Sequence, residues 1–160
     1  MSQKFKFELF ADYFQFYLQD ENTKGDLSES WNEEAVDRLL AIAPGTIGVG
    51  TVRNMNVPVV VEVIDKAPES NDAGDWDQVN EGSMEVTSSR IVVAGCTDYF
   101  PAATRIDVDP GWYRARIHYG DLDSLSANGL EGKDHYRIVI WKAEPGPIKV
   151  LKARVKQAKS

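Results

Sequence analysis

The sequence predicts a mainly β protein: an antiparallel β-sandwich of about nine or ten strands with one α-helix. Three observations lead to this prediction. Apolar and polar residues alternate with a period of two through most of the chain, turn residues separate the segments at short intervals, and only residues 31–43 carry clear helical spacing. Among the 160 residues, 42% are hydrophobic and 10% aromatic, which is enough for a core, so we expect residues 1–160 to form a single domain.

The N-terminal segment predicts a strand whose buried face changes once. Apolar residues occupy odd positions from Phe5 to Leu9 and even positions from Phe10 to Leu18. A shift of one residue exchanges the two faces of a strand. We therefore expect a bulge or a bend near residues 11–12.

The helix is predicted over residues 31–43. Ser30 is the expected N-cap and Glu33 completes a capping box, while Pro44 and Gly45 end the helix. Four apolar residues share its predicted buried face. They are Val36, Leu39, Leu40 and Ala43.

The rest of the chain predicts short strands divided by turns and two long loops. Ser88 and Ser89 are expected to close a hairpin between two of these strands. The irregular segments 65–82 and 120–133 are the expected long loops. The predicted strands are 46–53, 57–64, 83–87, 90–94, 104–108, 112–119, 135–141 and 148–155.

The charge of the chain is acidic and unevenly distributed. The formal net charge is −7, but residues 133–160 hold eight Lys and Arg against two acidic residues, which leaves −13 on residues 1–132. Phosphate binding needs a basic surface, so we expect no direct binding to nucleic acid. An acidic body suits a basic protein partner, although acidity can also serve solubility alone.

No apolar run approaches the roughly 20 residues that a membrane-spanning helix needs, and the N-terminus lacks the apolar block of a signal peptide. Cys96 is the single cysteine and therefore cannot form an internal disulfide. Together these features predict a soluble, cytoplasmic protein without membrane contact. They leave the oligomeric state open.

No set of residues predicts catalysis, a metal site or a cofactor. The two histidines lack the spacing of a zinc pair, Cys96 has no neighbouring base, and the glycines of residues 45–50 lead into a strand rather than a helix. Two pairs of aspartates do not continue into a calcium-binding loop pattern. The residues considered are His118, His135, Asp107, Asp109, Asp121 and Asp123.

The 65–82 segment is the first candidate for a partner-binding site. A tryptophan among acidic residues resembles an interface anchor with a charged rim, but a solvated loop whose Trp76 packs on the core fits equally well. The candidate contacts are Glu69, Asp72, Asp75, Trp76, Asp77 and Glu81, followed by Asp20, Glu21, Asp26 and Glu29.

Several short motifs resemble the competence protein ComJ family. They are residues 13–16 (YFQF), a polar loop with Asp20, residues 30–35 (SWNEEA), residues 41–45 (AIAPG) and residues 110–113 (PGWY). The resemblance covers residues 7–53 and, more loosely, 104–119. It implies a small protein that inhibits a DNA-entry nuclease by binding it, without a catalytic site of its own. It assigns inhibitory roles to no numbered residue.

Charge and resemblance together favour an acidic, intracellular protein-binding module of the bacterial nuclease-inhibitor or immunity type, which acts by occluding a basic cleft. The alternative is a β-sandwich that binds a small ligand or carbohydrate on exposed tryptophans without catalysis. An enzyme with paired carboxylates ranks last, because nothing selects one pair among the many acidic residues.

Overall fold

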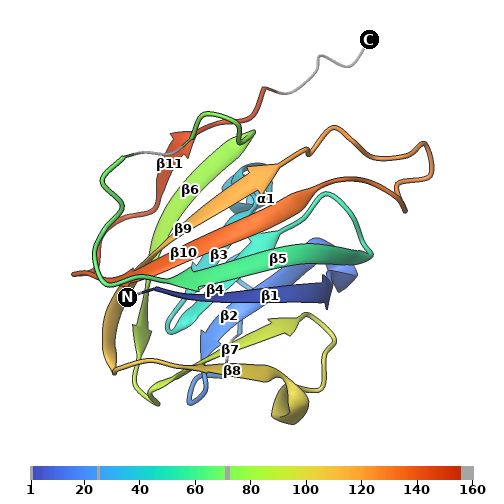
Figure 1. The fold of residues 1–160 in the computed structure, drawn as a ribbon. Helices are drawn as coiled ribbons and strands as arrows, with labels where there is room; N and C mark the ends of the chain where they lie inside the picture. The colour runs from blue at the N-terminus through green and yellow to red at the C-terminus, as the bar shows by residue number, and fades with distance from the viewer. Residues whose placement is uncertain (1, 25, 71–72, 156–160) are drawn as a thin grey trace.

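Two β-sheets pack face to face in the computed structural model, which describes residues 2–24, 26–70 and 73–155 (Figure 1). The elements are β1 (Gln3–Phe10), η1 (Asp12–Phe14), β2 (Gln15–Asp20), α1 (Glu33–Arg38), β3 (Leu40–Ala43), β4 (Thr46–Gly50), β5 (Asn56–Val63), β6 (Gln78–Val86), β7 (Arg90–Gly95), η2 (Phe100–Ala102), β8 (Thr104–Asp107), β9 (Gly111–Gly120), β10 (His135–Lys142) and β11 (Lys149–Lys152). One sheet has the order β1-β5-β10-β9-β6-β11 and the other the order β3-β4-β2-β7-β8. Neighbouring strands are antiparallel, except that β5 and β10 run parallel.

The core lies between the two sheets, because most strands turn apolar side chains inward at every second position. Phe16 of the five-stranded sheet meets Tyr136 of the six-stranded sheet edge to face, with ring centroids 5.9 Å apart. Tyr136 makes the same kind of contact with Tyr119 of β9. The predicted β-sandwich is therefore confirmed, with the parallel β5–β10 pair as a feature that the sequence pattern did not indicate.

The change of buried face near residues 11–12 marks a crossing between the sheets. β1 pairs with β5 in the six-stranded sheet, whereas β2 pairs with β4 and β7 in the other. The fully buried Ala11 and the short η1 make the turn between them. The alternation shifts because the core lies on opposite sides of the two sheets, and not because one strand carries a bulge.

The predicted helix over residues 31–43 is wrong in its second half and in its cap. α1 covers only Glu33–Arg38, and Asn32 rather than Ser30 caps it by accepting from Ala35 N. Leu39 adopts a left-handed φ of 63° and ends the helix. The following residues pair with β4 instead, and Pro44 and Gly45 form the turn between β3 and β4. A helix would have left this edge of the sheet without a partner strand.

Among the described residues, no helix is long and apolar enough to span a membrane.

The predicted hairpin around Ser88 and Ser89 is also wrong. β6 pairs with β9 and β11, whereas β7 pairs with β2 and β8, so this turn connects the two sheets. β6 also begins at Gln78, five residues before the predicted strand at 83. Gln78 and Asn80 point inward and donate to Arg38 O, at 2.5 and 2.7 Å. Because these inward positions are polar, the start of the strand lacks the apolar alternation by which a strand is predicted.

Candidate protein-binding surface

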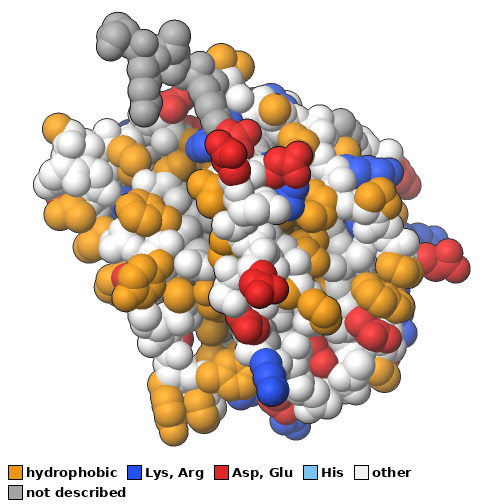
Figure 2. Space-filling model, turned by 180° about the vertical axis from the view of Figure 1, so that it is seen from behind, with side chains coloured by type: hydrophobic (Ala, Val, Ile, Leu, Met, Phe, Trp, Pro, Cys, Tyr) orange, Lys and Arg blue, Asp and Glu red, His pale blue; other side chains and the backbone are white. Residues whose placement is uncertain are grey.

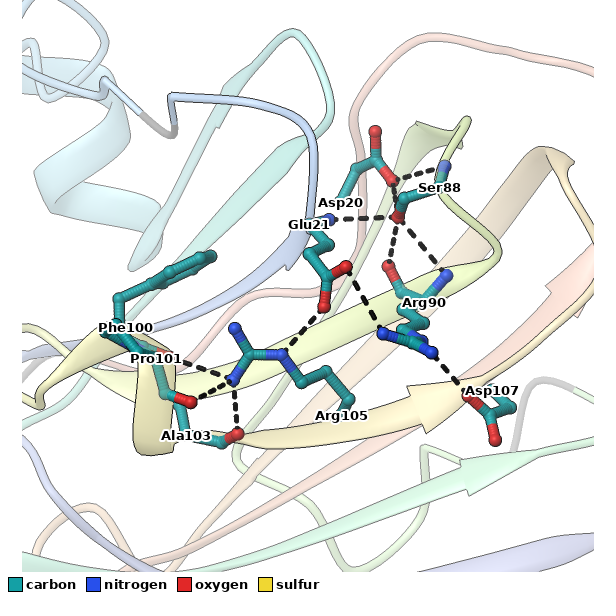
Figure 3. Close-up of polar contacts among 9 residues, drawn as sticks. All are labelled: Asp20, Glu21, Ser88, Arg90, Phe100, Pro101, Ala103, Arg105 and Asp107. Carbon is teal, nitrogen blue, oxygen red and sulfur yellow. Dashed lines mark hydrogen bonds and ion pairs between the residues drawn. The ribbon is translucent and has the colours of Figure 1, made fainter.

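Asp20, a predicted contact, is buried at the end of β2 and is 3% exposed. Its carboxylate accepts a hydrogen bond from Thr87 Oγ1 at 2.6 Å. It also accepts hydrogen bonds from Ser88 N at 3.0 Å and from Ser88 Oγ (Figure 3). Burial acts to raise the pKa of Asp20, but the hydrogen bonds from Ser88 and Thr87 outweigh it, so the pKa lies below its ordinary value. Asp20 therefore ties β2 to the turn between β6 and β7 and offers no free carboxylate to a partner.

Glu81 lies within β6, 8% exposed, and not in a loop. Its two carboxylate oxygens pair with Arg114 Nε at 3.1 Å and with Arg116 Nη2 at 2.8 Å, both from β9. The register of the sheet explains this pairing, because Glu81 stands directly opposite Arg116. Glu81 neutralises buried guanidinium groups, so it does not contribute to the exposed acidic surface.

The acidic segment that precedes β6 is shorter than predicted and is anchored to the six-stranded sheet. Arg116 Nη1 donates to Ser70 O at 2.8 Å, and Lys152 Nζ donates to Ala73 O at 3.2 Å. Glu69 and Asp75 are exposed on this segment, whereas the predicted contact Asp72 lies outside the described residues.

Trp76 packs against the protein and does not project as a free anchor. Its ring lies between the imidazole rings of His118 and His135, with centroids 5.1 Å away from each. The neighbouring Asp77 accepts from Leu122 N at 2.8 Å. Trp76 therefore folds back on the outer face of the six-stranded sheet and not on the core between the sheets.

Asp26 and Glu29, which belong to the second group of predicted contacts, lie on an exposed acidic surface. Residues 26–37 contain five acidic and no basic residues. Asp26, Glu29, Glu33 and Glu34 are all exposed; we call these four residues the α1 acidic face. Figure 2 shows acidic side chains running down the middle of the rear surface, where α1 lies.

The α1 acidic face is rigidly supported. Leu27, Trp31 and Ala35 pack on the outer face of the five-stranded sheet, against Ala41. A β carbon at Gly48 would lie 2.6 Å from Leu27 Cδ1, so glycine at this position allows the segment to pack closely. Glu33 and Glu34 were not among the predicted contacts, because the sequence pattern marks Glu33 as part of a helix cap and does not show that both side chains are exposed beside Asp26 and Glu29.

Glu21, the remaining candidate, is half-buried in an ion-pair network at the other end of that sheet (Figure 3). It accepts from Arg105 Nε at 2.8 Å and lies 3.5 Å from Arg90 Nη1. Arg90 also approaches Asp107 at 3.7 Å. The hydrogen bond from Arg105 holds the pKa of Glu21 below its ordinary value. Glu21 is thus paired with cations of its own chain.

A cleft of about 790 Å³ lies beside this network, between the ends of the two sheets. Its walls carry Glu21, Asp65, Asp107 and Asp109, together with Arg90 and Lys142. This lining mixes both signs of charge. No cluster of three or more metal-ligating side chains is found among the described residues.

The tryptophans do not form the shared platform expected of the carbohydrate-binding alternative. Trp31 packs beneath α1, Trp76 lies between two histidines, and Trp141 is buried with Arg116 over its ring. Trp112 is the exposed one.

The predicted contacts therefore divide between two outer faces. Glu69, Asp75 and Trp76 lie over the six-stranded sheet, where Arg116 and His118 point outward. Asp26 and Glu29 lie over the five-stranded sheet. The structure does not bring the two groups together into one surface. The fold and the α1 acidic face define a two-sheet β-sandwich with an exposed acidic face over its five-stranded sheet.

Two solved structures have this fold. One is ComJ from Bacillus subtilis, described as an inhibitor of the DNA-degrading activity of NucA; the TM-score is 0.66 and the identity 18%, with 89% of this chain and 99% of that chain covered. The other is described as crocagin biosynthetic gene J; the TM-score is 0.63 and the identity 20%, with 90% of this chain and 99% of that chain covered. The predicted resemblance to ComJ is confirmed at the level of the fold. No protein-family model matches the sequence, and no curated protein matches it significantly.

Proposed function

We propose that this protein is a binding module of the nuclease-inhibitor or immunity type, which occludes the basic cleft of a protein partner. The observation that carries the proposal is the fold that it shares with ComJ, over 89% of the chain. The proposed partner is a basic protein, of which a nuclease is the first candidate, because an enzyme that holds phosphate needs a positive cleft. We further propose that residues 1–160 act as one domain in the cytoplasm.

The α1 acidic face is the proposed first contact. Glu29, Glu33 and Glu34 are exposed, and no cation pairs with them among the residues that the structure describes. Their charge is available to a partner, since a packed segment holds them in place. Complementary charge of this kind mainly raises the association rate.

The acidic segment with Glu69 and Asp75 is the second candidate. Lys152 donates to Ala73 O and to Gly74 O within this segment, and Arg116 reaches Ser70 O. These cations lie beside the carboxylates and reduce the negative potential there. A cation also reaches α1, where Arg154 Nη2 donates to Asp37 O at 3.5 Å. That is one such contact against three on the second segment, and this difference favours the α1 acidic face.

The test begins with capture of the tagged protein's partner from its own cell lysate at low salt, followed by elution with rising salt. We expect a basic protein, released at moderate salt, whose nuclease activity falls to zero when titrated with one equivalent of this protein. Recovery of no basic protein, or of a nuclease that stays active, would refute the inhibitor proposal.

Two charge reversals of equal size then locate the surface. Glu33→Lys with Glu34→Lys should lower the association rate about tenfold at low salt, and the loss should shrink as salt rises. Glu69→Lys with Asp75→Lys is the matched control on the opposite face and should change the rate much less. If the control pair causes the larger loss, the second candidate surface is the correct one.

A further inference from the structure

Five of the large hydrophobic side chains that are exposed among the described residues gather at one end of the sandwich. They belong to three segments that the backbone holds together: Ala11 N donates to Met55 O at 3.0 Å, and Phe10 O lies against Gly95. Hydrophobic side chains are visible along this end at the lower left of Figure 2. We define the aromatic end by the residues Phe10, Tyr13, Phe14, Met55 and Tyr99.

The aromatic end contains an unusual stretch of backbone. Tyr13 and Phe14 are consecutive and both left-handed, with φ of 56° and 60°. Residues with a β carbon rarely adopt this conformation, and a strained backbone concentrates at functional sites. Core packing does not account for the aromatic rings, because their residues are 69% and 53% exposed. Glycine would satisfy the backbone, so the side chains themselves need another explanation.

The strained turn is nevertheless firmly held. Phe14 N donates to Asn54 Oδ1 at 3.3 Å, and Thr51 N donates to Phe14 O at 2.9 Å. The two rings are therefore presented on an ordered backbone, which lowers the entropy lost when a partner binds. Exposed, preorganised tyrosines and phenylalanines are typical of the centres of protein interfaces.

The charges around the aromatic end indicate the chemistry of the partner. Asp12 is half-buried and Asp98 exposed, and neither pairs with a cation among the described residues. The nearby arginines are already paired: Arg53 with the buried Asp134 at 2.8 Å, and Arg105 with Glu21. Lys24 lines a pocket together with Asp98, so the two carboxylates outnumber the one lysine and the net charge at this end is negative.

We propose that the aromatic end is the binding hot spot for an arginine- or lysine-bearing segment of a protein partner. A cation can lie over the faces of Tyr13, Phe14 or Tyr99 and pair with Asp12 or Asp98. A second copy of this chain fits less well, because it would bring the same carboxylates against each other. The identity of the partner rests on the proposed function, whereas the location of the hot spot does not.

The hot spot and the α1 acidic face make different contributions. Charges at the edge of an interface mainly change the association rate, whereas buried aromatic contacts mainly change the dissociation rate. Loss of the aromatic end should therefore speed dissociation with little dependence on salt.

The test uses the full chain and the basic protein recovered by the low-salt capture. Tyr13→Gly with Phe14→Gly removes both rings while glycine accepts the left-handed backbone. We expect dissociation about 30-fold faster, an association rate within about threefold of the native one, and no fall in the urea midpoint. Trp112→Ala removes an exposed aromatic ring from β9 and is the matched control, with dissociation unchanged.

Tyr99→Ser gives a second measurement that touches no left-handed residue, and we expect dissociation about tenfold faster. Native dissociation rates in both aromatic-end variants would overturn the hot spot while leaving the proposed function intact. Recovery of no basic protein would overturn both proposals. A native dimer in sedimentation experiments that the glycine variant abolishes would overturn the cationic partner in favour of a second copy.

Discussion

Replacement of Asp20 by alanine tests how the two sheets are held in relation to each other. The carboxylate accepts three hydrogen bonds, from Thr87 Oγ1, Ser88 N and Ser88 Oγ, at a position that is 3% exposed. Hydrogen bonds to a charged group contribute about 1.5–3 kcal/mol each. Thr87 is exposed and can regain a bond to water, so the loss is less than the sum.

We expect Asp20→Ala to lower the free energy of unfolding by about 2–4 kcal/mol at pH 7. For a chain of this size, the melting temperature should fall by about 4–16 °C. Urea unfolding followed by circular dichroism measures the change. Asp107→Ala is the control, because the Asp107 side chain is 90% exposed, and its effect should stay within about 0.5 kcal/mol.

The same carboxylate predicts a dependence on pH. The pKa of Asp20 is lower in the folded protein than its ordinary value of 3.8. Its stabilising contribution is therefore complete above that ordinary value and is lost as the pH falls towards the lower folded value. The stability difference between the native protein and Asp20→Asn should be constant near neutral pH and narrow below about pH 4. A difference that widens in acid, or a loss below 0.5 kcal/mol for Asp20→Ala, would refute this reasoning.

Two further substitutions test the packing of each sheet. Glu81→Ala should lower the free energy of unfolding by about 3–5 kcal/mol, because Arg114 and Arg116 would keep buried charges without their shared carboxylate. Urea unfolding measures the change, and an unchanged urea midpoint would contradict this role of Glu81. Gly95→Ala should cost at least about 2 kcal/mol, because its β carbon would collide with Phe10 O; Gly74→Ala, with no atom within 4 Å of its β carbon, is the control and should change the midpoint little.

The sequence predicts the fold class and the alternation of buried and exposed residues well. Alternation with a period of two indicates a sandwich, since a strand between a core and water must alternate. The shift between Leu9 and Phe10 indicates that the buried face changes. These are local properties, which each segment carries whatever its partners are.

The candidate contacts were harder to predict, because the same carboxylate serves different purposes at different places. Asp20 and Glu81 are of a residue type that is usually exposed, yet both are buried. Asp20 accepts a hydrogen bond from Thr87, 67 positions away, and Glu81 accepts one from Arg116, 35 positions away. The prediction that the helix continues beyond Leu39 was wrong for a related reason. Apolar residues at helical spacing can also form an edge strand, as residues 40–43 do in β3.

The sequence by itself determined that this protein is acidic, rich in strands and able to form a two-sided core, because these properties follow from composition and local alternation. Only the tertiary structure decided which strands pair, which acidic residues remain exposed, and that Tyr13, Phe14 and Tyr99 share one end. Pairing and burial depend on segments far apart in the chain, and each is settled by the register and packing of all the strands together.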